Sequence, residues 1–291
     1  MKPRDDETGM ILVNVLMFVA IASGIVLLLI SREELALDRG LRMREASRAL
    51  AVVRGGELSA LVALRRDAEV APDEDHVGEP WAKLSESGAP IEGGTFDLAI
   101  ADAEGRFNLN SLRSGEANSV VLFQTIGQGA GLTPEQIVAT IEYVRLHGPV
   151  TDLRPLRLAG IDPKVVDRLE RLVTALPGKT SLNLNAADPE LLGVLFHDPL
   201  VAARLAAVRQ RQGYLTLKDL TDQNASMPWG ASFRSNTFWV RTRATIGGTS
   251  QQTATLIQRR RLPDGRVEVV PVERWRNAAV PPGAPAFPVK S

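Results

Sequence analysis

An uncharged apolar run near the start of the chain constrains its fold more than any other feature. Met10–Ile30 contains 21 residues without a charged side chain, and Asn14 and Ser23 are its only polar members. At a rise of about 1.5 Å per residue, a helix of this length spans roughly 30 Å, the thickness of the apolar core of a bilayer. We therefore expect residues 10–30 to form a transmembrane segment.

Two simpler interpretations of this run remain open. A cleaved secretory signal has an apolar core of about 7–15 residues followed by a small-residue cleavage site. The run in this chain is longer, and no clear site of that kind ends it. A plain single-pass anchor explains the hydrophobicity, but it does not explain why Gly9 stands directly before the run.

The short polar leader that ends in Gly9, followed at once by the apolar run, resembles the N-terminus of type IV pilins and pseudopilins. The resemblance implies that a prepilin peptidase cuts after Gly9 and that Met10 becomes an N-methylated first residue. Most members of that class carry Glu at the fifth mature position, where this chain has Asn14. An amide avoids the cost of a buried charge in lipid. It is compatible with a subunit at a fibre end, and equally with simple sequence drift.

The periodicity of the remaining chain predicts an α+β fold. Apolar residues recur at helical spacing from Leu35 to Leu64, so the apolar run continues as one long helix, with Gly55-Gly56 as a potential interruption. Alternation over 95–110 and 237–275 predicts strands, and helical patterns fill the stretch between them. We expect a pilin-like long N-terminal transmembrane helix packed on an antiparallel sheet, with a large all-helical domain inserted between strands.

This pattern divides the chain into six predicted parts. They are a leader peptide (1–9), a transmembrane segment (10–30), the N-terminal helix and first part of the pilin-like α/β domain (31–110), an inserted helical domain with helix-hairpin-helix-like units (111–236), the remaining strands of the sheet (237–277) and a Pro-rich, disordered tail (278–291).

Composition narrows the functional classes. Lys plus Arg and Asp plus Glu both number 34, and the chain has no cysteine. A net charge of zero argues against a globally basic nucleic-acid-binding protein. The lack of cysteine excludes disulfides and thiolate metal sites and allows an extracytoplasmic location. The sequence contains no nucleophile elbow, P-loop, HExxH or dinucleotide-binding glycine pattern. We therefore expect no enzyme, and no catalytic, cofactor-binding or metal-ligating residues.

The helical insertion and the order of three segments make the resemblance more specific. Glu104–Asn110, Leu156–Pro177 and Leu182–Ala187 follow one another as in the general secretion pathway protein K family, the large minor pseudopilins of type II secretion systems. The resemblance covers nearly the whole chain.

The resemblance implies a structural role in protein export across the outer membrane. Such a subunit caps the tip of the pseudopilus with I- and J-type minor pseudopilins and primes assembly of the major pseudopilin. It also implies a prepilin peptidase and inner-membrane lipid as partners. The chain would cross the bacterial inner membrane once, with its soluble domain in the periplasm.

Calcium is implied by the resemblance alone. Many members of the family bind calcium and have an Asp-rich loop, whereas the matching loop Tyr143–Val150 has no paired carboxylates. Calcium requires about six to eight oxygen ligands, so we expect no cofactor at this loop. The acidic run Asp73-Glu74-Asp75 remains open as a cation site, although consecutive carboxylates on a loop are more often solvated.

The alternative interpretation is a membrane-anchored DNA-binding protein. Leu158–Pro163 and Leu182–Tyr214 resemble helix-hairpin-helix units, which offer backbone amides and a helix N-terminus to phosphate. Asp162 stands at the second glycine position of the first hairpin, and Phe196-His197-Asp198 contains no glycine. Residues 195–220 carry a net charge of only +2, which is small for a phosphate track. We therefore expect helical packing units and no nucleic-acid partner.

Overall fold

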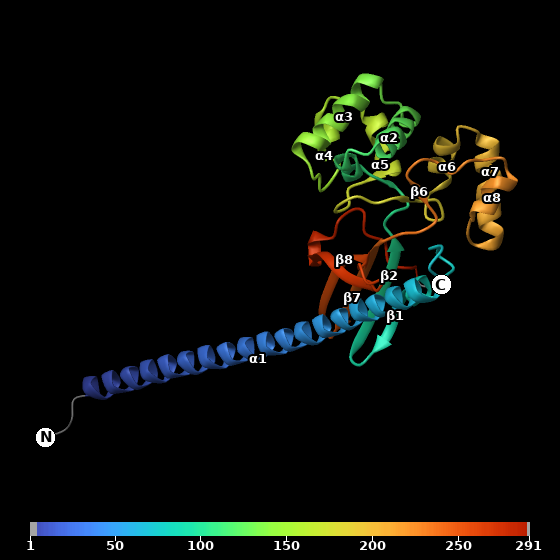
Figure 1. Ribbon diagram of the computed structural model, residues 1–291. Helices are drawn as coiled ribbons and strands as arrows, with labels where there is room; N and C mark the ends of the chain where they lie inside the picture. The colour runs from blue at the N-terminus through green and yellow to red at the C-terminus, as the bar shows by residue number, and fades with distance from the viewer. Residues whose placement is uncertain (1–4, 290–291) are drawn as a thin grey trace.

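One long helix forms the axis of the protein (Figure 1). The structure, a computed structural model, describes residues 5–289 and the side chains of residues 12–157 and 159–289. Helix α1 (Asp5–Val70) runs without interruption for 66 residues, so Gly55-Gly56 do not break it. Its N-terminal part projects away from the rest of the molecule, and the described side chains from Leu12 to Met43 are exposed.

The C-terminal half of α1 packs on a five-stranded antiparallel sheet. Its strand order is β1-β2-β7-β8-β9, and every neighbouring pair is antiparallel. The strands are β1 (Glu86–Ile91), β2 (Gly94–Asp102), β7 (Thr237–Ile246), β8 (Thr249–Arg261) and β9 (Val267–Arg276).

Alternation along the strands gives the sheet an apolar face toward α1. In β2 the side chains of Leu98 and Ile100 enter a buried cluster with Leu64 of α1 and Phe238 of β7. Gly56 faces the sheet at close range: a Cβ atom there would lie 2.5 Å from the tip of the Phe96 ring, which would have to shift. In β7, Phe238 and Val240 belong to this cluster, whereas Trp239 between them belongs to a different one, so the predicted alternation is confirmed.

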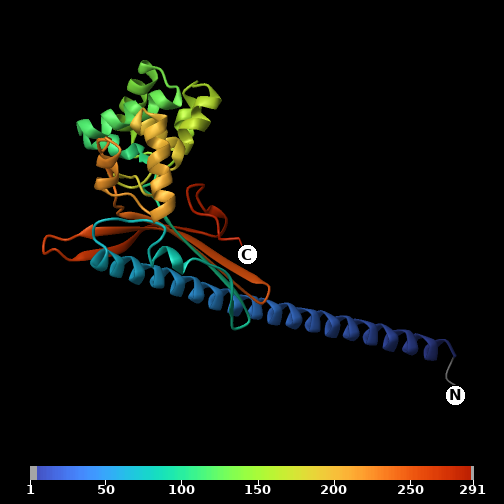
Figure 2. The same cartoon turned by 90° about the vertical axis from the view of Figure 1, so that its right-hand side faces the viewer.

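The helical insertion leaves the sheet after β2 and returns at β7, two adjacent strands that pair from Asp102 opposite Phe238. It lies at the end of the molecule away from the N-terminal part of α1 (Figures 1 and 2). Its helices are η2 (Leu109–Ser114), α2 (Ala117–Ala130), α3 (Pro134–His147), α4 (Arg154–Leu158), α5 (Pro163–Leu172), α6 (Pro189–Phe196), α7 (Pro199–Gln212) and α8 (Leu217–Asp222).

These helices enclose a core of their own, in which Phe107 stacks on Phe123 with ring centroids 5.7 Å apart. Two short parallel ladders lie at the base of the insertion. They pair β3 (Phe107–Asn108) with β4 (Val173–Thr174) and β5 (Leu182–Asn183) with β6 (Ala231–Ser232). The domain boundaries at 111 and 236 stay a prediction, and η2 already begins at Leu109.

The structure corrects two expectations. Residues 106–110 do not extend the main sheet, because β3 pairs with β4 inside the insertion. The tail expected to be disordered from residue 278 is ordered as far as residue 289. It begins as η3 (Asn277–Ala279) and then packs against the sheet through Val280 and Ala284. The last two residues, 290 and 291, lie outside the described residues.

Candidate functional site: the assembly helix and the buried polar cluster

The first candidate site is the exposed apolar surface of α1. Among the described residues, one helix is long and apolar enough to cross a membrane, and its apolar window has a mean hydropathy of 2.7 with none of it buried. A contiguous apolar surface of this kind marks a contact with lipid or with another protein. Asn14 is exposed on this surface. Gly9 and Met10 lie within the backbone of α1, and nothing of the Met10 side chain is described.

Carboxylates along one side of α1 fasten the helix to β8 and β9. Glu57 and Asp67 are buried, and burial strengthens their charge-assisted bonds because water competes less for them. The contacts join Glu45 to Thr249 (3.0 Å), Glu57 to Thr255 (2.8 Å), Glu57 to Arg274, and Asp67 to Arg259 (2.5 Å).

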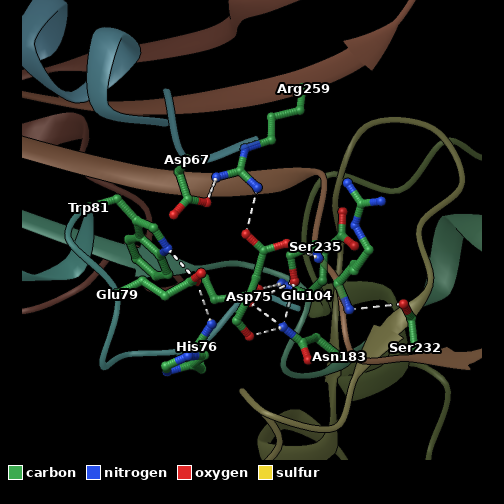
Figure 3. A network of polar contacts seen from close by, with 12 residues as sticks. Asp67, Asp75, His76, Glu79, Trp81, Glu104, Asn183, Ser232, Ser235 and Arg259 are labelled. Carbon is green, nitrogen blue, oxygen red and sulfur yellow. Dashed lines mark hydrogen bonds and ion pairs between the residues drawn. The ribbon is translucent and has the colours of Figure 1, made fainter. Parts of the chain in front are cut away.

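At the end of α1, Arg259 stands among three buried carboxylates (Figure 3). Its guanidinium donates to Asp67 Oδ2 and to Asp75 Oδ1, both at 2.5 Å, and lies 4.5 Å from the centroid of the Phe238 ring. Glu79 completes the group of three acids, whose oxygens lie within 4.8 Å of one another. One cation thus faces three acids, and burial raises the pKa of Asp67 to about 6 despite the neighbouring guanidinium.

Asn183 joins the insertion to this cluster. Its Nδ2 donates to the backbone oxygen of Asp75 at 3.0 Å, to Asp102 Oδ2 at 2.7 Å and to Ser235 Oγ at 3.0 Å. Ser235 in turn donates its amide to Asp75 and its hydroxyl to Asp102. Asp102 ends β2 and Ser235 precedes β7, so this network closes the base of the insertion where the chain leaves and re-enters the sheet. Figure 3 shows Asp75, Asn183 and Ser235 converging there.

Glu104 is a buried acid of the same region whose carboxyl group lacks hydrogen-bond partners within the described part of the chain. It is fully buried, and neither carboxyl oxygen has a hydrogen-bond partner among the described residues. Desolvation raises the pKa of Glu104 to about 8, and the nearby Thr237 hydroxyl and Asn236 backbone offset this only in part. Burial also raises the pKa of Asp102 to about 6. The site therefore holds Glu104 as a neutral acid near pH 7.

Comparison with known proteins gives relatives over nearly the whole chain. No family model matches it. Type II secretion system protein K of Pseudomonas aeruginosa is 28% identical over 314 residues, which cover 92% of each protein. The protein of the same name from Klebsiella pneumoniae is 25% identical over 256 residues, covering 70% of this chain and 78% of the relative.

The chain is a homologue of type II secretion system protein K. One chain of the crystal structure of the GspK-GspI-GspJ complex from the enterotoxigenic Escherichia coli type 2 secretion system has the same fold. The two match with a TM-score of 0.57 and 19% identity over 82% of this chain and 99% of that chain. The expected resemblance, the α+β pilin-like fold with its long apolar helix, and the role of a minor pseudopilin are confirmed.

The residues of this protein K homologue do not fit calcium at either candidate position. The loop at 143–150 offers no carboxylate. In the cluster at the end of α1, the Arg259 guanidinium takes the place where a cation would balance Asp67 and Asp75. Glu79 Oε2 already accepts from the His76 amide and from Trp81 Nε1, each at 2.9 Å. Too few oxygens remain for a set of six to eight ligands.

In the helix-hairpin-helix-like units of this homologue, aspartate side chains of the chain itself cap the helix N-termini. The Asp162 side chain accepts from the Lys164 amide, and Asp198 accepts from the amides of the first turn of α7. Arg209 is not free to contact phosphate, because Nη1 donates to the backbone oxygens of Leu184 and Ala187. The backbone amides that would bind a phosphate therefore already donate to carboxylates. This supports the interpretation of these units as helices that pack within the protein.

Sequence reasoning missed the buried cluster. The acidic run at 73–75 was expected to be solvated, yet Asp75 is 1% exposed and bound to Arg259. The partners are separated by 184 residues along the chain, so no local pattern connects them. The order of Leu182–Ala187 in the sequence indicates a family, but it does not reveal that Asn183 is buried and donates to three partners in the fold.

Proposed function

We propose that this minor pseudopilin caps the tip of the type II secretion pseudopilus and primes assembly of the major pseudopilin beneath it. In this proposal α1 anchors the chain in the bacterial inner membrane and the soluble part lies in the periplasm. I- and J-type minor pseudopilins bind beside it. Its role is structural, with no reaction of its own.

One observation carries the proposal. The insertion lies over the C-terminal end of α1, at the opposite end of the molecule from the exposed apolar segment (Figure 2). Subunits that assemble through parallel helices add along that axis. A bulky domain at the far end therefore leaves room for a neighbour below but obstructs one above, which is the property of a terminal subunit.

Two further features support it. The solved structure with the same fold belongs to a complex named for K, I and J components. Asn14 cannot form the ion pair with a neighbour's N-terminal amine that a Glu would form, so its position suits a subunit that does not stack on another in the regular way. An uncharged side chain also enters lipid at lower cost.

The test of partnership is reconstitution from soluble parts. Residues 32–291 omit only the exposed apolar stretch of α1 and what precedes it. Mixed with the soluble regions of the I- and J-type pseudopilins of the same system, they should elute as one ternary complex in size-exclusion chromatography with light scattering. Separate elution of all three proteins at micromolar concentration would contradict the proposal. The matched control replaces the I- and J-type proteins with the soluble region of the major pseudopilin.

The test of processing uses the full chain. Co-expression with a prepilin peptidase should shorten it by the nine residues that end in Gly9 and add a methyl group to the amine of Met10, both visible by intact-mass spectrometry. A Gly9→Leu variant is the control and should keep the full mass. An unchanged wild-type mass, or cleavage near residues 22–24, would show that the leader is not of the pilin kind.

A further inference from the structure

The C-terminal segment 280–289, called the strap below, lies on the sheet face that α1 does not cover. In Figure 2 the red end of the chain passes over the sheet on the side opposite α1. The strap contains Val280-Pro-Pro-Gly-Ala-Pro-Ala-Phe-Pro-Val289. Four prolines in ten residues restrict the backbone to extended conformations, so a segment of this composition loses little entropy when it binds.

The strap is seated by side chains rather than by strand pairing. Val280 and Ala284 pack in a cluster with Trp239 and Trp275, whose rings lie 5.3 Å apart. A Cβ atom on Gly283 would meet the Trp239 indole at 3.7 Å. The contacts described for the strap include no ladder with the edge of the sheet, so it can leave without breaking the sheet.

Two arginines hold the far end of the strap. The guanidinium carbons of Arg241 and Arg243 each lie 4.5 Å from the centroid of the Phe287 ring. Arg241 Nη1 also donates to the backbone oxygen of Pro285 at 3.0 Å. An aromatic ring close to two guanidiniums gains cation–π attraction from both, about 0.5–2 kcal/mol each.

The strap covers a surface formed by Trp239, Trp275, Arg241 and Arg243, which we call the groove below. The strap does not satisfy every hydrogen-bond donor of this surface. Arg241 Nε is buried and has no hydrogen-bond partner among the described residues, and a buried unsatisfied donor costs about 1–3 kcal/mol. An occupant with one more acceptor at this point would therefore bind better than the strap does. Grooves lined with aromatic side chains are also the usual receptors for extended proline-rich segments.

We propose that this face of the sheet is a docking groove for an extended, proline-rich segment of another protein chain that carries an aromatic residue, and that the strap fills the groove in the free subunit. Because the strap is tethered, its effective concentration at the groove is on the order of millimolar. A partner segment takes its place only when assembly holds that segment close by. The strap thus keeps an apolar, arginine-lined surface covered until then.

The test uses the full chain in detergent micelles and a fluorescent peptide of residues 280–289. Three proteins are compared by fluorescence anisotropy: the wild type, a chain ending at Ala279, and the full chain with Phe287→Ala. The peptide should bind the shortened chain saturably at or below about 1 mM, since the groove is then open. It should bind the wild type at least roughly tenfold more weakly. The Phe287→Ala chain should lie between the two, because its strap is loosened.

A Phe287→Ala peptide is the matched ligand control, and its affinity for the shortened chain should fall roughly tenfold with the loss of both arginine contacts. The wild type also reports any binding to the micelle itself. Equal binding to all three proteins, or no saturable binding to either variant, would overturn the proposal. If the shortened chain does not fold, the Phe287→Ala chain decides the result, because it keeps every other strap contact.

Discussion

At the residue scale, Arg259 is the side chain on which the end of α1 depends most. It balances Asp67 of the helix and Asp75 of the following loop, and all three side chains are at most 4% exposed. Removal of one member of a buried ion pair leaves a desolvated charge behind, which costs far more than loss of a surface pair. The arginine supplies from within the chain the positive charge that a bound cation would otherwise supply.

Arg259→Met should therefore lower the free energy of unfolding by about 3–5 kcal/mol at pH 8, measured by urea denaturation of residues 32–291. The loss should be smaller at pH 5, because the pKa of Asp67 is raised to about 6 and its carboxyl can then take up a proton. The extended methionine side chain keeps most of the packing volume, so the change tests charge.

Arg260→Met is the matched control, because Arg260 is the next residue of β8 and is exposed. It should change stability by less than about 0.5 kcal/mol. Calcium or EDTA should leave the wild-type unfolding midpoint unchanged. Equal costs for the two substitutions, or a wild-type protein that EDTA destabilises, would show that Arg259 is not the balancing cation.

The second residue-scale prediction concerns Glu104. Its pKa in the folded protein, about 8, lies above the usual value of 4.5. The folded state therefore holds a proton that the unfolded state releases, and stability falls as pH rises toward 8. Asp67 and Asp102 act in the same direction, but with pKa values of about 6 they are already half ionised at pH 6 and add less to the change above it. Glu104 alone should lower the unfolding free energy by about 2 kcal/mol between pH 6 and pH 8.

Glu104→Gln should remove most of this drop, since the amide imitates the neutral acid. The measurement is urea denaturation at pH 6, 7 and 8. Glu142→Gln, a substitution at an exposed position of α3, is the control and should keep the wild-type slope. A Glu104→Gln chain with an undiminished slope would place the titrating group elsewhere.

At the element scale, the contact of α1 with the sheet depends on two adjacent glycines with opposite surroundings. A Cβ atom on Gly56 would lie 2.5 Å from the Phe96 ring, whereas one on Gly55 would meet nothing within 4 Å. Both residues lie inside the helix, where glycine costs about 0.5–1 kcal/mol relative to alanine. Of the two, only Gly56 has a neighbour that a Cβ atom would displace.

Gly56→Ala should destabilise residues 32–291 by about 1–3 kcal/mol, because the helix and Phe96 must move apart. Gly55→Ala should stabilise the same protein by up to about 1 kcal/mol. Thermal unfolding followed by circular dichroism compares the two. If the two substitutions changed the stability in the same direction and by the same amount, α1 would not approach the sheet as closely as described.

The elements that sequence predicted are those whose signals are local. In the structure, Thr133 and Gln136 form a capping box, and Asp162 and Asp198 cap the helices they precede. Strand β1 was missed because its Ser-Gly-Ala-Pro composition is atypical of strands and only pairing with β2 fixes it. The packing of the strap could not be predicted for a similar reason. Nothing in a proline-rich sequence indicates that it contacts Trp239 and Arg241.

At the scale of the whole molecule, the sequence is enough to predict the protein family, but it is not enough to predict the buried polar network. The apolar run, Gly9 and the order of the insertion motifs were enough to predict the resemblance, because an apolar run and the glycine before it are signals in consecutive residues. The network that joins the insertion to the sheet brings together Asp75, Asp102, Asn183 and Ser235 from four distant segments. Only the fold places them together.

A subunit that ends the pseudopilus should be found at one end of the fibre and nowhere along it. The direct measurement is to place an epitope tag in the exposed α6–α7 region of the insertion, in cells that assemble pseudopili from its own secretion system. Gold-labelled antibody is then located by electron microscopy. We expect one label at one end of each pseudopilus. Labels spaced along the shaft would contradict it.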